Sequence, residues 1–364
     1  MQAAARAPGR PRAPRERTHK RPSYDGGVPK LLHAARNPLA YLDQRWTPHP
    51  HTVRRATLAA LVMSVVIVVT GGAVRLTGSG LGCETWPKCG ADSLTATPEM
   101  GLHGAIEFGN RLMTYVVCAA VGWAIVAARC TAPRRRGLTR LAWSQFWVVV
   151  ANALVGGVTV LLELNPWIVA AHFLAATALV TTSTLTWLRA REGDAPPRPL
   201  AGRRVRQLAA VLTAVTALLV VAGTVVTGTG PHAGDSSEVP RMPFDWETVA
   251  RAHSALAWSV VALTVLLWLV LRVVDAPLAP RARVRELLVV LLAQAGVGYA
   301  QYATDLPVVL VGIHLLGSAL VWIAALRVQL SLRERGPEPH TAVPGPAGRA
   351  QAAAASEPTS ATPA

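Results

Sequence analysis

The chain has 364 residues, of which 51% are hydrophobic and 15% charged, and its formal net charge is +16. A basic chain can bind nucleic acid, but here the arginines flank long apolar runs and do not alternate with aromatic residues, so we expect no nucleic-acid partner. The distribution indicates instead a protein of the lipid bilayer, with its charge concentrated in the tails and in short loops.

The two ends of the chain differ in composition from the middle. Residues 1–52 are rich in Arg, Pro and Ala without a periodic apolar face, and they are predicted to form a disordered, basic cytoplasmic tail. Residues 334–364, rich in Pro, Ala, Thr and Ser, are predicted to form a second disordered tail. The first apolar run begins near Ala56, too far along for a cleaved signal peptide, so it is expected to remain as a membrane anchor.

Between the tails lie eight apolar runs, each long enough to cross a bilayer, which takes about 18 residues or more. Arginines cluster before the first run and after each even-numbered run, whereas the other loops hold few basic residues and one of them is acidic. By the positive-inside rule, both termini are cytoplasmic in a multi-pass protein of the plasma membrane. The fold class is therefore all-α and integral to the membrane, with helices at about 56–75, 105–128, 140–162, 167–189, 206–227, 249–273, 285–303 and 307–329.

The second half of the chain resembles the first. Residues 152–156 (NALVG) are similar to residues 294–298 (QAGVG), and each segment begins with an amide twenty residues before a histidine, His172 or His314. Four helices return the chain to the same side of the membrane, so the halves form a parallel repeat. We predict two four-helix bundles, residues 53–192 and residues 193–333.

The repeat places histidines at matching depths. His253 and His314 lie 61 residues apart at the outer ends of the sixth and eighth runs, whereas the residue 62 positions before His172 is Asn110. Two neutral imidazoles from adjacent helices of a bundle are natural axial ligands of haem iron, while zinc would require a third or fourth ligand. We therefore predict that His253 and His314 bind one haem iron and His172 a second; the alternative is hydrogen-bonded packing.

Residues 103–111 carry a polar stripe. At 3.6 residues per turn, His103, Glu107, Asn110 and Arg111 share one side of a helix, and a charge in a bilayer costs roughly 2.5–3.5 kcal/mol on insertion scales. Glu107 could pair with Arg111 at the i,i+4 spacing, or it could move protons or orient water beside a haem; we favour the second. His103 could ligate the second iron or be a loop histidine at the interface.

Three arginines, Arg75, Arg111 and Arg251, are predicted at outer helix ends. A guanidinium there could hold haem propionates through two parallel hydrogen bonds, or it could extend its charged end to the interface. The sequence leaves both interpretations open.

Of the four cysteines, Cys83 and Cys89 share one loop on the predicted outer side. That side is oxidising, so we predict a disulfide between them, with two free thiols as the alternative. Cys118 and Cys130 lie in or at the end of an apolar run and are expected to be inert.

The segment 75–89 (RLTGSGLGCETWPKC) closely resembles the first outer loop of the haem A synthases, and the resemblance extends from about Ala56 to Leu330. It implies an oxidoreductase that converts the C8 methyl group of haem O to a formyl group, giving haem A for terminal oxidases. It also implies a haem O synthase and an electron donor as partners. The site residues that it implies are His253 and His314 for a resident haem b, His172 for the substrate haem, Glu107 as the catalytic glutamate, and the disulfide Cys83–Cys89.

One position departs from the family. The usual Glu-x-x-His-Arg motif reads here Glu107-Phe108-Gly109-Asn110-Arg111. Either His103 replaces the missing ligand, or the substrate iron has a single protein ligand. The second hypothesis for function is a di-haem electron-transfer protein, which Asn110 disfavours because four ligands would be required. A transporter built from a parallel repeat is disfavoured because the Gly pairs lie mostly near the ends of the runs.

Overall fold

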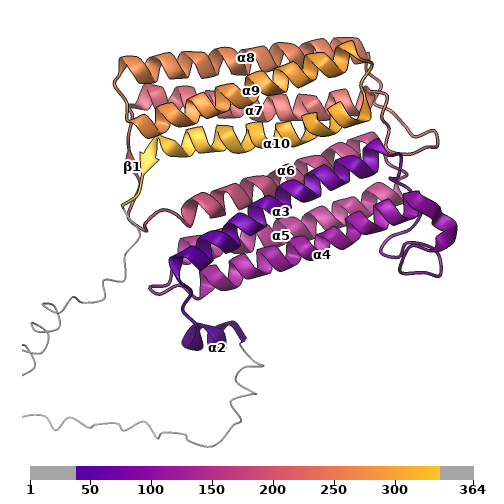
Figure 1. The fold of residues 1–364 in the computed structure, drawn as a ribbon, viewed down its shortest axis with the longest axis horizontal. Coiled ribbons are helices and arrows are strands. Elements are labelled where there is room, and N and C mark those ends of the chain that lie inside the picture. The colour runs from indigo at the N-terminus through magenta and orange to yellow at the C-terminus, as the bar shows by residue number, and fades with distance from the viewer. Residues whose placement is uncertain (1–37, 337–364) are drawn as a thin grey trace, which may run out of the picture.

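The computed structural model describes residues 38–336, and this region is predominantly helical. Eight long helices follow one another, and Figure 1 shows them lying side by side. They are α3 (Pro50–Leu76), α4 (Gly101–Arg129), α5 (Arg136–Leu161), α6 (Pro166–Arg189), α7 (Arg203–Thr229), α8 (Trp246–Val273), α9 (Leu278–Ala303) and α10 (Val308–Ser331). The short elements are α2 (Pro38–Arg45), the 3₁₀ helix η1 (Pro98–Met100), β1 (Arg198–Pro199) and β2 (Arg333–Glu334).

Each predicted apolar run lies within one long helix, or within one residue of its ends, and most helices begin a few residues before the run. Local capping explains several of these starts. The Asn165 side chain accepts a hydrogen bond from the Trp167 N–H (3.1 Å), and Asp245 accepts one from the Thr248 N–H (2.8 Å). In these two helices the capping residue directly precedes the first helical residue, Pro166 or Trp246.

Seven of the eight long helices are long and apolar enough to cross a membrane, which confirms an all-α integral membrane protein. The exception is α9, whose first turns carry Arg281, Arg283, Arg285 and Glu286. These charges reduce the apolar length, so composition alone supports seven spans where the sequence analysis predicted eight.

The long helices form two groups of four (Figure 1). In the first group α3 packs on α4, α4 on α5, α5 on α6, and α6 returns to α3; α7 to α10 are arranged in the same way. The groups meet where α10 contacts α3 and α6, and where α6 contacts α7. A small core that joins them contains Leu61, Val68, Ala176 and Val180, with Trp322 packed against it.

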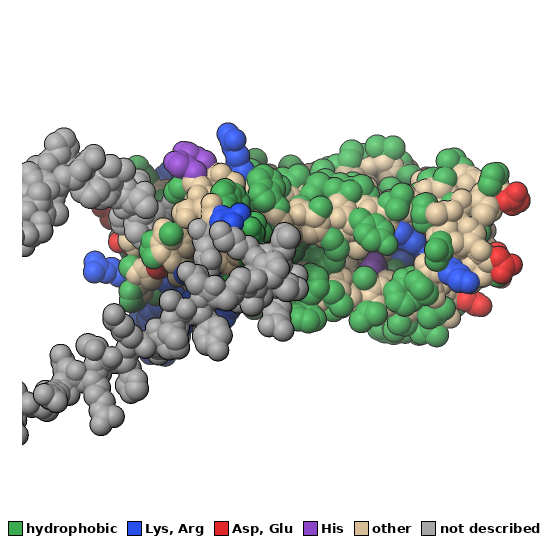
Figure 2. Space-filling view, turned by 90° about the horizontal axis from the view of Figure 1, so that it is seen from below, with side chains coloured by type: hydrophobic (Ala, Val, Ile, Leu, Met, Phe, Trp, Pro, Cys, Tyr) green, Lys and Arg blue, Asp and Glu red, His purple; other side chains and the backbone are tan. Residues whose placement is uncertain are grey.

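The outer surface of the helices is apolar. Tyr115 and Val309 are each 72% exposed, and many Leu, Val and Trp side chains are also exposed. Figure 2 shows hydrophobic side chains covering much of the length of the molecule, with most charged side chains toward its two ends. Lipid is the solvent that such a surface requires.

The segments next to the predicted tails are partly ordered. Residues 38–45, inside the predicted tail 1–52, form α2. Asp43 of α2 forms an ion pair with Arg129 at the end of α4. Glu334, the first residue of the other predicted tail, belongs to β2, which pairs with β1 in the linker between the two groups. For these residues the prediction of disorder is wrong, because it ignored contacts with distant segments. Residues 1–37 and 337–364 lie outside the described region.

Candidate functional site

His253 and His314 face each other inside the second group. Each lies near the amino-terminal end of its helix, α8 or α10, and their ring centroids are 6.5 Å apart with the ring planes at 60°. In the ring of contacts, α8 and α10 occupy opposite corners. The two imidazoles therefore meet across the centre of the bundle rather than from adjacent helices as expected.

The surroundings of these rings suit one metal ion between them. The Nδ1 atom of His314 is buried without a hydrogen-bond partner in the described structure, and His253 lies against the backbone of Leu219. A Cβ built on Gly223 would lie 3.3 Å from His253 Cε1, and one on Gly298 would lie 3.4 Å from His314 Cε1. Two metal–nitrogen bonds of about 2.1 Å each, plus the radii of two rings, require a centroid separation of roughly 6.5 Å. The spacing therefore fits a two-imidazole iron site.

The ligand set also argues against zinc. Among residues 38–336, no group of three or more His, Cys, Asp or Glu side chains could hold a metal ion. Zinc sites in proteins usually have three or four protein ligands. A haem brings most of its iron's ligands itself, so His253 and His314 would suffice to hold it here.

His172, on α6, has the same construction in the first group. Its Nδ1 is buried without a hydrogen-bond partner in the described structure, and a Cβ on Gly156 of α5 would lie only 2.8 Å from its Cε1. Gly156 precedes His172 by sixteen residues, as Gly298 precedes His314. The similarity noticed in the sequence thus corresponds to a repeated contact between a glycine and an imidazole. The contact that each glycine makes with its histidine was not predicted from the sequence.

Asn110 lies on α4, the helix opposite α6 in the first group. Its Oδ1 accepts a hydrogen bond of 2.8 Å from the Thr70 hydroxyl of α3. The amide is thus held by the neighbouring helix. An amide is a poor iron ligand, so the first group presents one imidazole where the second presents two.

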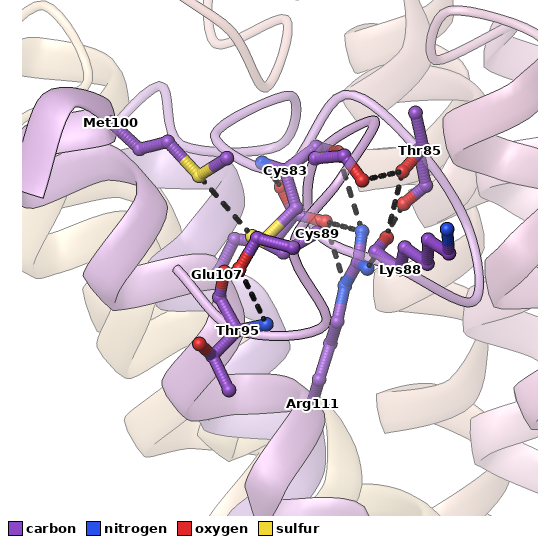
Figure 3. Close-up of a disulfide and its surroundings, with 10 residues drawn as sticks. Cys83, Thr85, Lys88, Cys89, Thr95, Met100, Glu107 and Arg111 are labelled. Carbon is purple, nitrogen blue, oxygen red and sulfur yellow. Dashed lines mark hydrogen bonds and ion pairs between the residues drawn. A yellow bond between two sulfur atoms is a disulfide. The ribbon is translucent and has the colours of Figure 1, made fainter. Parts of the chain in front are cut away.

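Glu107 is buried, 5% exposed, at the outer end of α4 (Figure 3). Its Oε2 accepts a hydrogen bond of 2.6 Å from the Cys83 N–H, and its Oε1 accepts two from Arg111, at 2.6 Å from Nη2 and 3.1 Å from Nε. The predicted disulfide Cys83–Cys89 is present. The carboxylate is therefore held between its own helix and the disulfide loop.

Arg111 fastens that loop to α4. Its Nη1 donates to the carbonyl oxygens of Thr85 (3.0 Å) and Lys88 (2.9 Å), and its Nη2 also donates to that of Cys83 (3.3 Å). With the two bonds to Glu107, all five guanidinium N–H groups are engaged. This geometry assigns Arg111 to positioning, because a predicted contact with a haem propionate would have to displace one of these bonds.

His103 lies in the first turn of α4, and its exposed side chain forms a 2.9 Å hydrogen bond with Ser79 Oγ. Ser79 forms an isolated β-bridge with Asp235, which accepts a 3.3 Å bond from the Leu81 N–H. Asp235 belongs to the loop between α7 and α8, so a loop of the second group is joined here to the loop between α3 and α4. Sequence reasoning missed this contact.

The environment of Asp235 holds it in the ionised form. Partial burial raises the pKa of Asp235, but hydrogen bonds from Ser237 and Leu81, together with the nearby His103, outweigh that effect and keep the pKa below its ordinary value. The joined loops thus carry a negative charge close to the buried carboxylate of Glu107.

Two of the predicted outer arginines differ in setting. Arg75 of α3 donates from Nη2 to the Thr227 carbonyl of α7 (2.8 Å), and its Nε is buried without a hydrogen-bond partner in the described structure. Arg251 is exposed and pairs with Glu247 at 3.1 Å. Arg75 can therefore offer a buried donor to an anion between the groups, whereas Arg251 has an ordinary surface ion pair.

Comparisons with known proteins give one family model and several similar relatives. Residues 54–326 match the model of the family COX15-CtaA, described as cytochrome oxidase assembly protein. The chain is 28% identical over 203 residues to a heme A synthase of Lysinibacillus sphaericus (54% of this chain, 63% of the relative). It is 30% identical over 208 residues to one of Methylobacterium nodulans (47% and 55%), and 29% identical over 190 residues to one of Listeria monocytogenes (50% and 60%). The chain thus aligns with little more than half the length of these curated relatives.

Proposed function

Because the chain belongs to the COX15-CtaA family of cytochrome oxidase assembly proteins, we propose that it acts as a haem A synthase, oxidising the C8 methyl group of haem O to a formyl group. The relatives it aligns with are named heme A synthase. The product, haem A, would serve terminal oxidases.

The observation that carries the proposal is the facing pair His253 and His314. Their 6.5 Å separation and glycine-lined edges support them as the residues that would hold a haem b iron. When bound, this group supplies the one-electron chemistry that side chains lack. The four helices around them hold both imidazoles in place.

In the first group, haem O is the proposed substrate and His172 its proposed protein ligand. Glu107, held by Arg111 and the disulfide loop, is the proposed acid–base group at the substrate's outer side. Asn110 and His103 both make hydrogen bonds to other residues, which favours the interpretation with a single protein ligand. One open coordination position suits a haem that must enter and leave.

We propose eight membrane crossings, with α9 as the eighth. It packs against α8 and α10, which are both apolar enough to span, and its charged turns lie at one end. Arg283 and Arg327 there pair with Glu286, at 2.5 and 3.0 Å. The predicted parallel repeat, the plasma-membrane location and the cytoplasmic termini complete this topology. A haem O synthase and an electron donor are the proposed partners.

Haem content tests the proposal. We would express the full chain in a host that makes haem O, extract the haems from the purified protein, and separate them by chromatography. Wild type should yield haem b with haem O or haem A. His314→Ala should lose haem b, His172→Ala should lose the farnesylated haem, and the exposed His51→Ala should match wild type.

Other results would contradict the proposal. Haem b alone in the wild type, despite a haem O supply, would indicate the di-haem electron-transfer alternative. A preparation without any haem would overturn the assignment of all three histidines.

A further inference from the structure

A basic cavity lies at the end of the molecule opposite the disulfide loop. It measures about 540 Å³ and is lined by His51, Arg54, Arg55 and Leu58 of α3 and by Arg191, just after α6. None of these five side chains is acidic. The haem sites are at the other ends of these helices, so this cavity is separate from them.

Two of the arginines that line the cavity have no acidic partner among residues 38–336. In the described region neither Arg55 nor Arg191 forms an ion pair with a carboxylate, whereas Arg283 and Arg327 nearby share Glu286. Burial lowers the pKa of Arg191, and the proximity of Arg54 and Arg283 lowers it further. An anion in the cavity would relieve this repulsion.

Arg191 is also held in a fixed position. Its guanidinium carbon lies 4.2 Å from the centroid of the Trp187 ring, in a cation–π contact. A guanidinium fixed in this way has less rotamer freedom to lose on binding, and its planar donors match the oxygens of a phosphate. The cavity is therefore organised before any ligand arrives.

We propose that this cavity binds the phosphate headgroup of an anionic phospholipid in the cytoplasmic leaflet. Two features select a lipid over a soluble anion. The arginines lie at the end of an apolar span, at the depth of lipid headgroups, and the exposed Leu58 lies one turn further into the membrane than Arg54, where an acyl chain would run. The proposal depends on the membrane orientation given above, and not on the haem chemistry.

The test measures lipid binding to the purified full chain in neutral detergent. Native mass spectrometry would count molecules of phosphatidylglycerol or phosphatidylcholine that the protein retains as each lipid is titrated. Two arginines near an anionic headgroup account for about thirtyfold in affinity, so Arg55→Gln/Arg191→Gln should bind phosphatidylglycerol about thirtyfold more weakly. Arg55→Gln alone, at an exposed position, should cost about fivefold even if the double variant does not fold.

Matched control variants distinguish lipid binding in the cavity from a general effect of positive charge at this end of the molecule. Arg134→Gln/Arg136→Gln removes two exposed arginines from the same end of the molecule and should leave binding unchanged. Arg55→Lys/Arg191→Lys keeps the charge and should retain most of the affinity. Haem content should be the same in all variants, so failure here is distinguishable from failure of the proposed function.

Three results would overturn the proposal. They are equal retention of phosphatidylcholine, equal weakening by the control pair, or inorganic phosphate that binds as tightly as the lipid and excludes it. The last result would identify the cavity as a site for a soluble anion.

Discussion

The two helix groups place different residues at equivalent positions. In the second group two imidazoles meet across the bundle, at a ring separation of 6.5 Å. In the first group one imidazole, His172, stands in a bundle whose opposite helix carries Asn110, held by Thr70. The same arrangement of helices thus presents two facing imidazoles in one group and a single imidazole in the other.

The outer ends of the two groups differ as well. The first group has a disulfide loop that is fastened to a buried carboxylate through Cys83 and Arg111. The loop between α7 and α8 in the second group makes no comparable contact among the described residues; it instead reaches over to Ser79. The proposed acid–base group, Glu107, is therefore fastened to a loop of the first group, and a loop of the second group lies beside it.

The largest expected effect comes from Glu107→Gln. Glutamine keeps an acceptor for the Cys83 N–H but removes the charge that Arg111 holds, and general acid–base groups contribute typically 10²–10⁴-fold to rate. Conversion of haem O should therefore fall by at least about a hundredfold. The rate would be measured by chromatography of the extracted haems over time.

The control for this variant is Glu99→Gln, which changes an exposed carboxylate in η1. It should behave as wild type, and haem b content should stay equal in all three proteins. Conversion by Glu107→Gln at the wild-type rate would show that the carboxylate is structural, and would remove the chemical contrast between the groups.

Gly156→Ala and Gly298→Ala compare the two groups directly. A Cβ at 156 would lie 2.8 Å from His172 Cε1, so something must shift, whereas at 298 the distance to His314 is an ordinary 3.4 Å. Overpacking costs typically 1–3 kcal/mol, so retention of the substrate haem should fall about tenfold in Gly156→Ala. Haem b retention in Gly298→Ala should change little. Equal effects of the two substitutions would mean that the glycine contacts do not set the histidine positions.

Several features were predictable from the sequence because local rules govern them. Apolar length predicts the long helices, and the matched spacing of His253 and His314 predicts that they lie at one depth. The placement of Cys83 and Cys89 in one outer loop predicts their disulfide. Each of these depends on neighbours along the chain or on a regular period.

Other features depend on contacts between distant segments, which leave no period in the sequence. The bond between the Asn110 side chain and Thr70 joins two helices, and the bridge between Ser79 and Asp235 joins two loops from different groups. The engagement of all donors of Arg111 depends on how the loop folds over α4. The limited apolar length of α9 was visible in the sequence, because four charged residues lie near the start of this helix.

Asn110→His would convert the first group to the pattern of the second. A second imidazole opposite His172 should add an axial ligand, so the substrate haem should leave about tenfold more slowly and turnover should fall with it. Transfer of haem to apomyoglobin, followed by absorbance, measures this release. Asn110→Gln keeps an amide and serves as the control. If Asn110→His releases the substrate haem at the same rate as wild type or faster, the substrate haem does not lie between residue 110 and His172.

The smallest effect is expected from Asp235→Asn, which weakens the bridge between the outer loops. Because the pKa of Asp235 is lowered in the folded protein, its ionised form contributes stability that is present above the ordinary carboxyl pKa of about 3.9 and is lost as the pH falls through the lower folded value. At pH 7 the variant should be less stable by about 0.5 kcal/mol, allowing for solvent screening, and the difference should shrink as the pH falls below about 3.9. Thermal unfolding across that range, with Glu238→Gln in the same loop as control, measures it. If the difference in unfolding free energy instead grows as the pH falls, the neutral form of Asp235 is the one that joins the two groups. The second group would then place no negative charge beside Glu107.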